Sequence, residues 1–323
     1  MNQIHSIMNK INKITIRSIF PVLMVLGGIF PVTESIAQQD SQFTQYMYNT
    51  QTINPAYTGS RGVLSLTGLY RTQWVGLDGA PETLNFSISS PISDRVGLGA
   101  SFYSDKIGPS TESNITVDFS YNLPLNENDT YLSFGLKGGI NILNVDYTLL
   151  NAEDPGAPDF ANNIENRTSP GVGVGVYLRG KDKWYAGISV PNLLETDHYD
   201  DIAVSDVTEK MHFYVIAGYV FDMSDSVKFK PAVLGKAVVG APLAVDVSAN
   251  FLFYDKLTLG AAYRWDAAVS GLVGFQFTDN IMLGYAYDYD TTELGNYNHG
   301  SHEFFVRFEF GTKNQRTINP RFF

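Results

Sequence analysis

Two histidines and three carboxylates lie close together near the carboxyl end of the chain. Asp288 and Asp290 precede His299 and His302, and Glu303 follows directly. Imidazole and carboxylate groups are ligands that zinc and similar ions accept in proteins. The same residue types also form polar clusters at loop ends without any metal. We favour the second interpretation and predict no metal site.

Glycine alternates with valine from Gly171 to Val176, which invites comparison with a dinucleotide-binding fingerprint. That fingerprint needs its glycines in the turn between a strand and a helix. Here they alternate within one extended run, which favours a strand with glycine on one face and valine on the other. We therefore predict no cofactor.

The chain also lacks the motifs of common hydrolases. It contains no cysteine, no Gly-x-Ser-x-Gly sequence and no His-Glu-x-x-His sequence, so the usual nucleophile and metalloprotease signatures are missing. We predict no catalytic residues and a protein that is not an enzyme.

Basic and acidic side chains are expected on the inner face of the wall that the predicted β-strands would form. Lys228, Lys230 and Lys236 share one face of an extended run. The other members of this set are Arg71, Lys137, Arg264, Arg307, Asp118, Asp246, Asp288 and Glu303. We favour salt bridges that stiffen the wall; the alternative is a charged interior that selects a threaded segment or a solute. Glycines on the same face would leave space for a plug, a partner segment or water; they are Gly97, Gly99, Gly135, Gly139, Gly173 and Gly175.

The stretch 280–310 indicates that β-strands carry these charged side chains and glycines. Apolar residues such as Leu283 and Phe304 alternate with small or charged ones such as Gly284 and Glu303. Side chains along a strand alternate between faces, so the stretch predicts two strands around a polar loop. A soluble sandwich alternates in the same way. The aromatic residues and the near-terminal strand ending in Phe310 favour an outer-membrane barrel.

The same pattern recurs from residue 62 onward and predicts an all-β fold. About 14 antiparallel strands would form a transmembrane β-barrel over residues 62–310, and an even number suits a bacterial barrel. The predicted strands are 62–74, 82–90, 95–104, 111–122, 130–144, 168–178, 183–190, 210–222, 227–239, 243–254, 257–266, 268–278, 280–290 and 301–310.

The connections between these strands alternate in length. With the N-terminus in the periplasm, the outward connections contain the long ones and the inward connections are short, except that 123–129 is somewhat longer, and this asymmetry is expected of such barrels. The long outward connections are 75–81, 105–110, 145–167, 191–209 and 291–300. The loops 145–167 and 191–209 are rich in Asp and Glu, which predicts an acidic outer surface.

Composition indicates export and excludes several classes. Residues 1–37 have a basic head, a short apolar core and the small-x-small site Ser35-Ile36-Ala37, as in a cleaved signal peptide. The chain has 33 acidic and 22 basic residues, so its surface should repel nucleic acid. Without cysteine, neither a lipoprotein anchor nor a disulfide framework is possible.

Several segments, in order, resemble the PorP/SprF-like outer-membrane proteins of the type IX secretion system in Bacteroidetes. The resemblance covers essentially the whole chain after residue 37. Its segments are Gln45-Tyr46-Met47-Tyr48-Asn49, Ile53-Asn54-Pro55-Ala56-Tyr57-Thr58-Gly59, Tyr70-Arg71-Thr72-Gln73-Trp74, Gly79-Ala80-Pro81, Asp105-Lys106-Ile107-Gly108-Pro109, Val190-Pro191-Asn192-Leu193-Leu194, Gly284-Tyr285-Ala286-Tyr287-Asp288-Tyr289, Gly300-Ser301-His302-Glu303 and Asn319-Pro320-Arg321-Phe322-Phe323.

The resemblance implies a non-enzymatic barrel in the outer membrane, in contact with its lipid. Its partners would be periplasmic components of the secretion and gliding-motility machinery and an exported cargo or adhesin with a C-terminal export domain. A porin-like channel for small solutes is the alternative function, and a soluble binding protein is a third.

The two segments that precede and follow the barrel in the sequence are expected to dock partners in the periplasm. One docking segment would be 38–61, before the barrel, and the other the tail 311–323, after it. The residues predicted for this role are Tyr46, Tyr48, Asn54, Pro55, Tyr57, Arg316, Arg321, Phe322 and Phe323.

Overall fold

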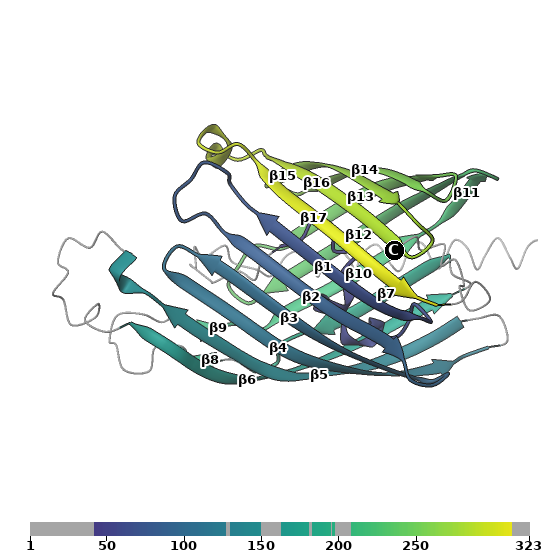
Figure 1. The fold of residues 1–323 in the computed structure, drawn as a ribbon, viewed down its shortest axis with the longest axis horizontal. Coiled ribbons are helices and arrows are strands. Elements are labelled where there is room, and N and C mark those ends of the chain that lie inside the picture. Colours follow the sequence, from purple (N-terminus) through teal and green to yellow (C-terminus); the bar gives the residue numbers. More distant parts are fainter. Residues whose placement is uncertain are drawn as a thin grey trace, which may run out of the picture. The chain divides into compact units, whose positions relative to one another are not determined.

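The alternating residues of the chain form an antiparallel β-barrel. The computed structural model describes residues 42–126, 130–149, 163–180, 183–194, 196–197 and 208–311. Figure 1 shows long, tilted strands running side by side around a common interior. Within the described residues, the sheet that forms this wall contains 15 strand segments.

The wall strands agree closely with the predicted ones. They are β1 (Leu64–Thr72), β2 (Glu82–Pro91), β3 (Val96–Ile107), β4 (Ser110–Pro124), β5 (Thr130–Val145), β6 (Ile164–Gly180), β7 (Trp184–Val190), β10 (His212–Tyr219), β11 (Phe221–Ser224), β12 (Val227–Val238), β13 (Ala244–Phe253), β14 (Leu257–Arg264), β15 (Ala268–Gln276), β16 (Ile281–Asp290) and β17 (Ser301–Phe310). A separate pair, β8 (Thr196–Asp197) and β9 (Thr208–Glu209), lies between β7 and β10 in the sequence.

Two pairings close the wall into a ring. The first strand pairs with the last along its full length, from Leu64 opposite Phe310 to Thr72 opposite His302. Elsewhere β10 and β11 both pair with β12, so they are one strand interrupted at Val220. The described residues therefore form a closed barrel of 14 strands, which confirms the predicted fold class.

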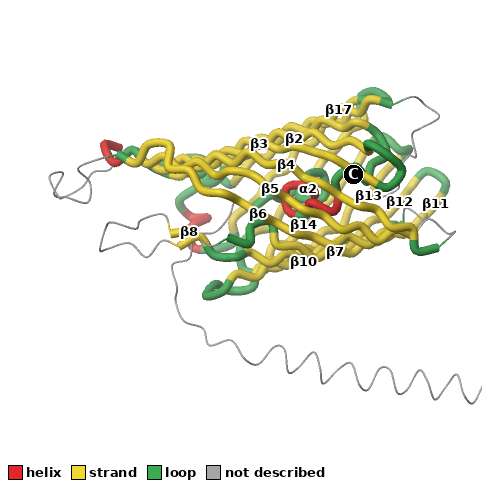
Figure 2. Tube along the Cα trace, turned by 90° about the horizontal axis from the view of Figure 1, so that it is seen from below, coloured by secondary structure: helices red, strands yellow, loops and turns green. Residues whose placement is uncertain are grey.

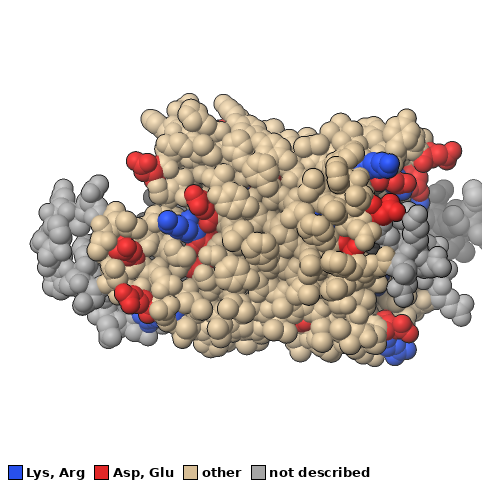
Figure 3. Space-filling model, viewed as in Figure 1, with Lys and Arg blue, Asp and Glu red and all other residues tan. Residues whose placement is uncertain are grey.

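Each strand turns its apolar face outward and its polar face inward. On β4, Val117 is 59% exposed on the outside, whereas Asp118 is fully buried inside. On β2, Phe86 is exposed and Asn85 is buried. Figure 3 shows the outcome as a broad belt without charged residues between two ends where charges gather. A barrel with this belt suits a bilayer, because hydrocarbon offers no partners for charged groups.

One end of the barrel carries the longer connections. The loops 73–81 and 291–300 lie at this end, which we call the outer end because external loops are the longer ones. The prediction of a loop at 105–110 is wrong. β3 continues to Ile107 and β4 begins at Ser110, so a two-residue turn connects them. Most of the acidic loop residues predicted in 145–167 and 191–209 lie outside the described residues.

The remaining secondary structure of the described residues consists of short helical turns. The helix α2 (Thr50–Ile53) and the 3₁₀ turn η1 (Pro55–Tyr57) lie within the ring of strands in Figure 2. The turns η2 (Tyr147–Leu149) and η4 (Glu293–Asn296) belong to connections. None of the helices in the described part of the chain has the length and apolar character to cross a membrane.

Candidate functional site in the barrel lumen

The N-terminal segment 42–61 fills the interior of the barrel, and we call it the plug. It consists of the turn 44–48, α2 and η1. Gln45, Ala56 and Thr58 are fully buried. These residues have no strand periodicity, and the wall around them supplies the hydrogen bonds that a sheet would otherwise provide. The plug is therefore the structural centre of the lumen.

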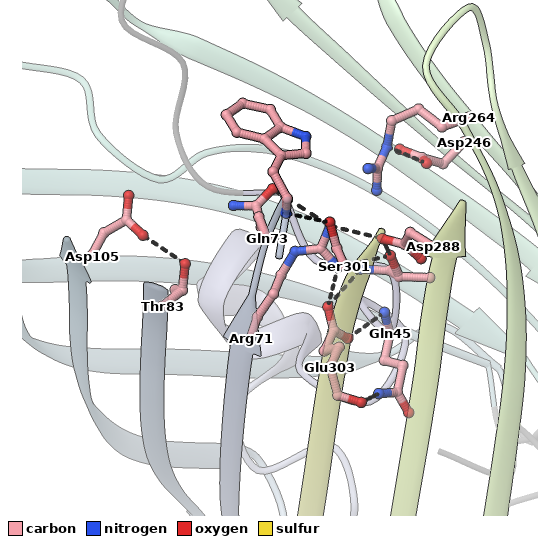
Figure 4. Close-up of polar contacts among 12 residues, drawn as sticks. Gln45, Arg71, Gln73, Thr83, Asp105, Asp246, Arg264, Asp288, Ser301 and Glu303 are labelled. Atoms are coloured by element: carbon pink, nitrogen blue, oxygen red, sulfur yellow. Dashed lines mark hydrogen bonds and ion pairs between the residues drawn. The ribbon is translucent and has the colours of Figure 1, made fainter. Parts of the chain in front are cut away.

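Carboxylates of the wall hold the outer end of the plug. The Glu303 carboxylate accepts hydrogen bonds from the backbone N–H of Thr44 (2.9 Å) and of Gln45 (2.8 Å). The Thr44 hydroxyl donates to Asp288 at 2.6 Å. Arg71 lies between these two carboxylates, 2.7 Å from Asp288 and 3.1 Å from Glu303 (Figure 4). One buried cation thus compensates two buried anions, and the Glu303 carboxylate also satisfies two buried backbone donors of the plug.

A second ion pair holds the middle of the plug. Lys137 lies 3.2 Å from Asp118, and both side chains are buried. The Gln51 amide donates to the Asp118 carboxylate at 2.9 Å. Lys137 also donates to the Thr52 carbonyl at 3.4 Å. The plug and the wall therefore share one polar network at mid-height.

Small hydroxyl groups of the wall hold the remaining turns. Ser189 donates to the Ile53 carbonyl and Ser120 to the Thr58 carbonyl, both at 2.6 Å. Asn54 accepts from the Ala56 N–H, which caps η1, and its amide donates to the carbonyl of Val176 at 3.1 Å. Near the inner end, Arg61 forms an ion pair with Glu309.

Aromatic contacts complete the packing. The ring of Tyr48 stacks on that of Phe305, with centroids 4.5 Å apart, and the Arg307 guanidinium lies 5.7 Å from the Tyr48 centroid. Burial raises the pKa of Tyr48 to about 12, so its phenol stays neutral. Tyr57 meets Tyr177 edge to face at 5.6 Å. Phe305, the apolar exception on the polar face of its strand, is thus explained as a contact for the plug.

Wall glycines make room for the plug. A Cβ atom at Gly135 would lie 2.1 Å from the nitrogen of Ala56, and one at Gly175 would lie 2.2 Å from the side chain of Asn54. The backbone of the plug approaches the wall this closely only where a side chain is missing. The predicted space inside the wall is confirmed at these positions and also at Gly97 and Gly99. At Gly139 and Gly173 the closest atoms belong to other parts of the barrel.

The predicted docking residues of segment 38–61 lie inside the barrel. Tyr46, Tyr48, Asn54, Pro55 and Tyr57 are all buried, so they present no periplasmic surface in this structure. Polar and aromatic residues without periodicity suit a solvated segment and a plug equally well, so the sequence alone did not distinguish these two arrangements. The tail residues Arg316, Arg321, Phe322 and Phe323 lie outside the described residues.

The charged residues of the wall behave largely as predicted. Salt bridges link Arg71 to Asp288 and Glu303, Lys137 to Asp118, and Arg264 to Asp246 at 2.8 Å. The predicted salt bridges are thus present among the described residues, and several of these pairs also hold the plug.

The histidine cluster does not assemble into a metal site. His302 lies on the outer face of β17 and its ring nitrogen contacts the Tyr285 hydroxyl at 2.8 Å, whereas Glu303 lies inside. Among the described residues, no three His, Cys, Asp or Glu side chains are grouped to hold a metal ion.

A cavity of about 140 Å³ lies in the outer half of the lumen. The plug residues Phe43, Thr52 and Ile53 bound it on one side. The wall strands contribute Asn85, Tyr103, Asp105, Glu112, Lys137, Gly171 and Tyr214. The plug therefore occupies the lumen without filling all of its outer half.

The family model described as "Type IX secretion system membrane protein PorP/SprF" matches residues 35–308, nearly the whole chain. The chain belongs to the PorP/SprF family. This PorP/SprF protein is an outer-membrane barrel, and its family is a class of secretion-system membrane proteins rather than of enzymes. No curated protein matches the chain.

Solved structures with a similar fold are outer-membrane barrels of low sequence identity. The CymD monoaromatic hydrocarbon channel shares 14% identity, with 84% of this chain and 94% of that chain covered and a TM-score of 0.49. A FadL homologue of Pseudomonas aeruginosa shares 11% identity, with 88% and 96% covered and a TM-score of 0.45. The outer-membrane protein Omp33 of Acinetobacter baumannii shares 9%, with 77% and 100% covered and a TM-score of 0.45.

Proposed function

We propose that this barrel works as a closed assembly component of the type IX secretion system rather than as an open pore. It would dock periplasmic components of the secretion or gliding machinery and support the export or surface attachment of a cargo adhesin. The observation that carries this proposal is the plug, which wall side chains hold at the outer, middle and inner levels of the lumen. Membership of the PorP/SprF family supplies the secretion context.

The buried plug argues against the alternative of a porin-like channel. A solute would have to pass Gln45, Ala56 and Thr58, which are fully enclosed by the wall. Each of the polar contacts that hold them would have to break for a continuous water-filled path to form. A barrel of 14 strands is wide enough for a lumen, but here the chain itself occupies that space.

Conductance measurements test the closed state. The purified full-length protein should show no steady current in a planar bilayer, whereas a variant lacking residues 42–57 should conduct. Heat-dependent mobility on gels would first establish that both barrels are folded. Steady open-channel current from the full-length protein would contradict the proposal and favour the porin alternative.

The outer loops 145–167 and 191–209 are proposed to hold the cargo. They are the longest connections at the outer end and the richest in acidic residues. Exchanging them for those of a paralogue should change which adhesin is displayed on the cell surface. An exchange of the loops 73–81 and 291–300 is the matched control. If the displayed adhesin does not change with the acidic loops, cargo recognition lies elsewhere.

The tail 311–323 is proposed to dock periplasmic machinery. The plug residues are enclosed, so of the nine predicted docking residues, four remain as candidates: Arg316, Arg321, Phe322 and Phe323. Deleting 312–323 should leave a folded barrel and reduce adhesin display. Replacing both arginines by lysine keeps the charge and serves as the control. Unchanged display after the deletion would remove this part of the proposal.

A further inference from the structure

A hollow of about 540 Å³ lies on the lipid-facing side of the barrel, and we call it the seam groove. It follows the seam where β1 pairs with β17 and extends from β2 on one side to β15 on the other. β1, β2 and β17 lie at the front in Figure 1, and Figure 3 views the same side. None of the described residues that line the groove is charged. The groove is therefore a depression in the apolar belt, separate from the lumen and its plug.

Two small residues form the floor of the groove at its centre. Gly68 on β1 is paired with Val306 on β17. Their neighbours in the register are much larger, because Phe86 lies opposite Gly68 on β2 and Phe304 lies opposite Tyr70 on β1. These three rings are exposed on the outer face of the wall. The groove is thus a low point of small side chains between walls of aromatic rings.

The plug supports the floor of the groove from inside the barrel. Leu69 and Phe305 also line the groove, but their side chains are buried. The ring of Tyr48 stacks on that of Phe305, with centroids 4.5 Å apart. Behind Gly284, another lining residue, a Cβ atom would lie 2.7 Å from the side-chain oxygen of Gln45. The packed plug keeps the floor in place, so the depression exists before any ligand arrives, which lowers the cost of binding.

The groove has a polar side and an apolar side. Tyr70 and Tyr285 lie two residues beyond Gly68 and Leu283 along their strands, in the direction of the outer end. The hydroxyl of Tyr285 contacts a ring nitrogen of His302 at 2.8 Å. The side toward the inner end, at Leu283, is apolar. A molecule in the groove should therefore have its polar part toward the outer end of the barrel.

The position of the groove indicates what fills it. The barrel lies in the outer membrane, so its apolar belt contacts lipid, and the groove is continuous with that belt (Figure 3). An unfilled depression costs van der Waals contacts on both the protein and the lipid. The groove spans two outward residues on each strand, about 7 Å, whereas a helix with its side chains is about 10–12 Å wide. A second copy of the barrel would bring a convex wall that leaves the depression unfilled. An extended hydrocarbon chain fits.

We propose that the seam groove binds one acyl chain of an outer-leaflet lipid as a specific ligand. The chain enters beside Tyr70 and Leu84, crosses Gly68 and Val306, and ends beside Leu283. The head group stays toward the outer end, where phenol hydroxyls donate hydrogen bonds to the ester oxygens of the lipid. This inference goes beyond the proposed function and does not rest on it.

Photo-crosslinking of the purified full-length protein in phospholipid nanodiscs tests the groove. The probes are two phosphatidylcholines with a saturated chain that carries a diazirine, either near the ester or near the methyl end, and mass spectrometry locates the adducts. Groove residues should carry about tenfold more adducts than outward residues elsewhere on the belt, such as Val117, as about ten additional van der Waals contacts per chain would give. The ester-end probe should mark Tyr70 and Leu84, and the methyl-end probe Val306 and Leu283.

Variants that fill the groove separate a bound chain from the lipid that surrounds any barrel. Gly68→Leu should reduce the adducts in the groove to the level of the belt. A Cβ atom at Gly68 would meet only the ring of Phe86 and a methyl group of Val306, both at 3.3 Å, and these side chains can shift at the lipid surface. Val306→Phe fills the groove from the neighbouring strand and should give the same loss. Gly138→Leu is the matched control, because Gly138 is exposed on β5, outside the groove, with open space around its Cβ position.

Four results would overturn the inference. Even labelling around the belt would mean that lipid passes the groove without being bound there. Unchanged labelling in both filled variants would place the bound chain elsewhere. Exchange of the two labelling patterns between the probes would mean that the chain enters from the inner leaflet. Dimers in native mass spectrometry, with a groove free of adducts, would show that a second copy of the barrel occupies it. Each of these can occur while conductance and adhesin display follow the proposed function, so failure of the two proposals is distinguishable.

Discussion

Single residues decide whether the plug can lie in the lumen. Gly135 and Gly138 lie on the same strand, three residues apart, but they face opposite sides of the wall. A Cβ at Gly135 would collide with the backbone of Ala56, whereas one at Gly138 has open space around it. The difference gives a matched pair of substitutions for testing the seat of the plug.

Gly135→Ala should displace the plug and leave the barrel intact, while Gly138→Ala should have no effect. Overpacking of a close contact costs roughly 1–3 kcal/mol. Because the chain has no cysteine, Ala56→Cys can report the position of the plug. We expect a water-soluble maleimide to label this cysteine in the Gly135→Ala background only. Equal labelling in both backgrounds would mean that the glycine has no role in seating the plug.

The network around Glu303 should be the most sensitive polar site. Its carboxylate is fully buried and binds two backbone N–H groups and Arg71. Glu303→Gln removes the charge and keeps the shape, and we expect a loss of about 3 kcal/mol in unfolding free energy, as for a broken buried ion pair. Urea unfolding of the barrel measures this loss of unfolding free energy, with the exposed Glu82→Gln as control. A loss no larger than the control's would show that the network contributes no stability.

At the scale of elements, the strands were predictable and the plug was not. A strand with one lipid face repeats every two residues, so β2, β4 and β13 appear in the sequence with nearly their true limits. The plug has no such period, because its contacts are made by the wall rather than by itself. The signal for it in the sequence was indirect: the inward glycines, which leave space for a plug, a partner segment or water.

The 3₁₀ turn η1 depends on one side chain that serves both plug and wall. Asn54 caps the turn at Ala56 and donates to the wall at Val176. Asn54→Ala should cost about 1 kcal/mol for the lost cap and about 1 kcal/mol more for the lost wall contact. Asn126→Ala, in an exposed turn, is the control. Thermal melting should show the difference, and equal melting of the two variants would argue against this double role.

At the scale of the whole molecule, the apolar belt requires lipid around it. Val117 is 59% exposed near the middle of β4, and Val239 is 61% exposed just beyond the outer end of β12. A soluble β-protein would tolerate arginine at either position. In a bilayer, arginine costs about 2–4 kcal/mol at the midplane and close to zero near the interface.

Val117→Arg should therefore destabilise the barrel far more than Val239→Arg when both are refolded into phospholipid vesicles. Equilibrium unfolding in urea gives the two differences. Similar costs at the two positions would mean that the belt does not lie across the hydrocarbon layer as the exposed residues indicate.

The proposed closed state requires that the plug lies inside the barrel in the cell. Asn49 on the plug and Asn85 on β2 share a hydrogen bond of 2.9 Å, and a variant with cysteine at both positions has no other thiol. A short bifunctional thiol reagent applied to intact outer membranes should join the two, and mass spectrometry would find the linked peptides. Asn49→Cys with Asn250→Cys, on β13 across the ring, is the control. Linkage of 49 to 85 but not to 250 is the predicted result; efficient single labelling of position 49 without linkage would contradict it.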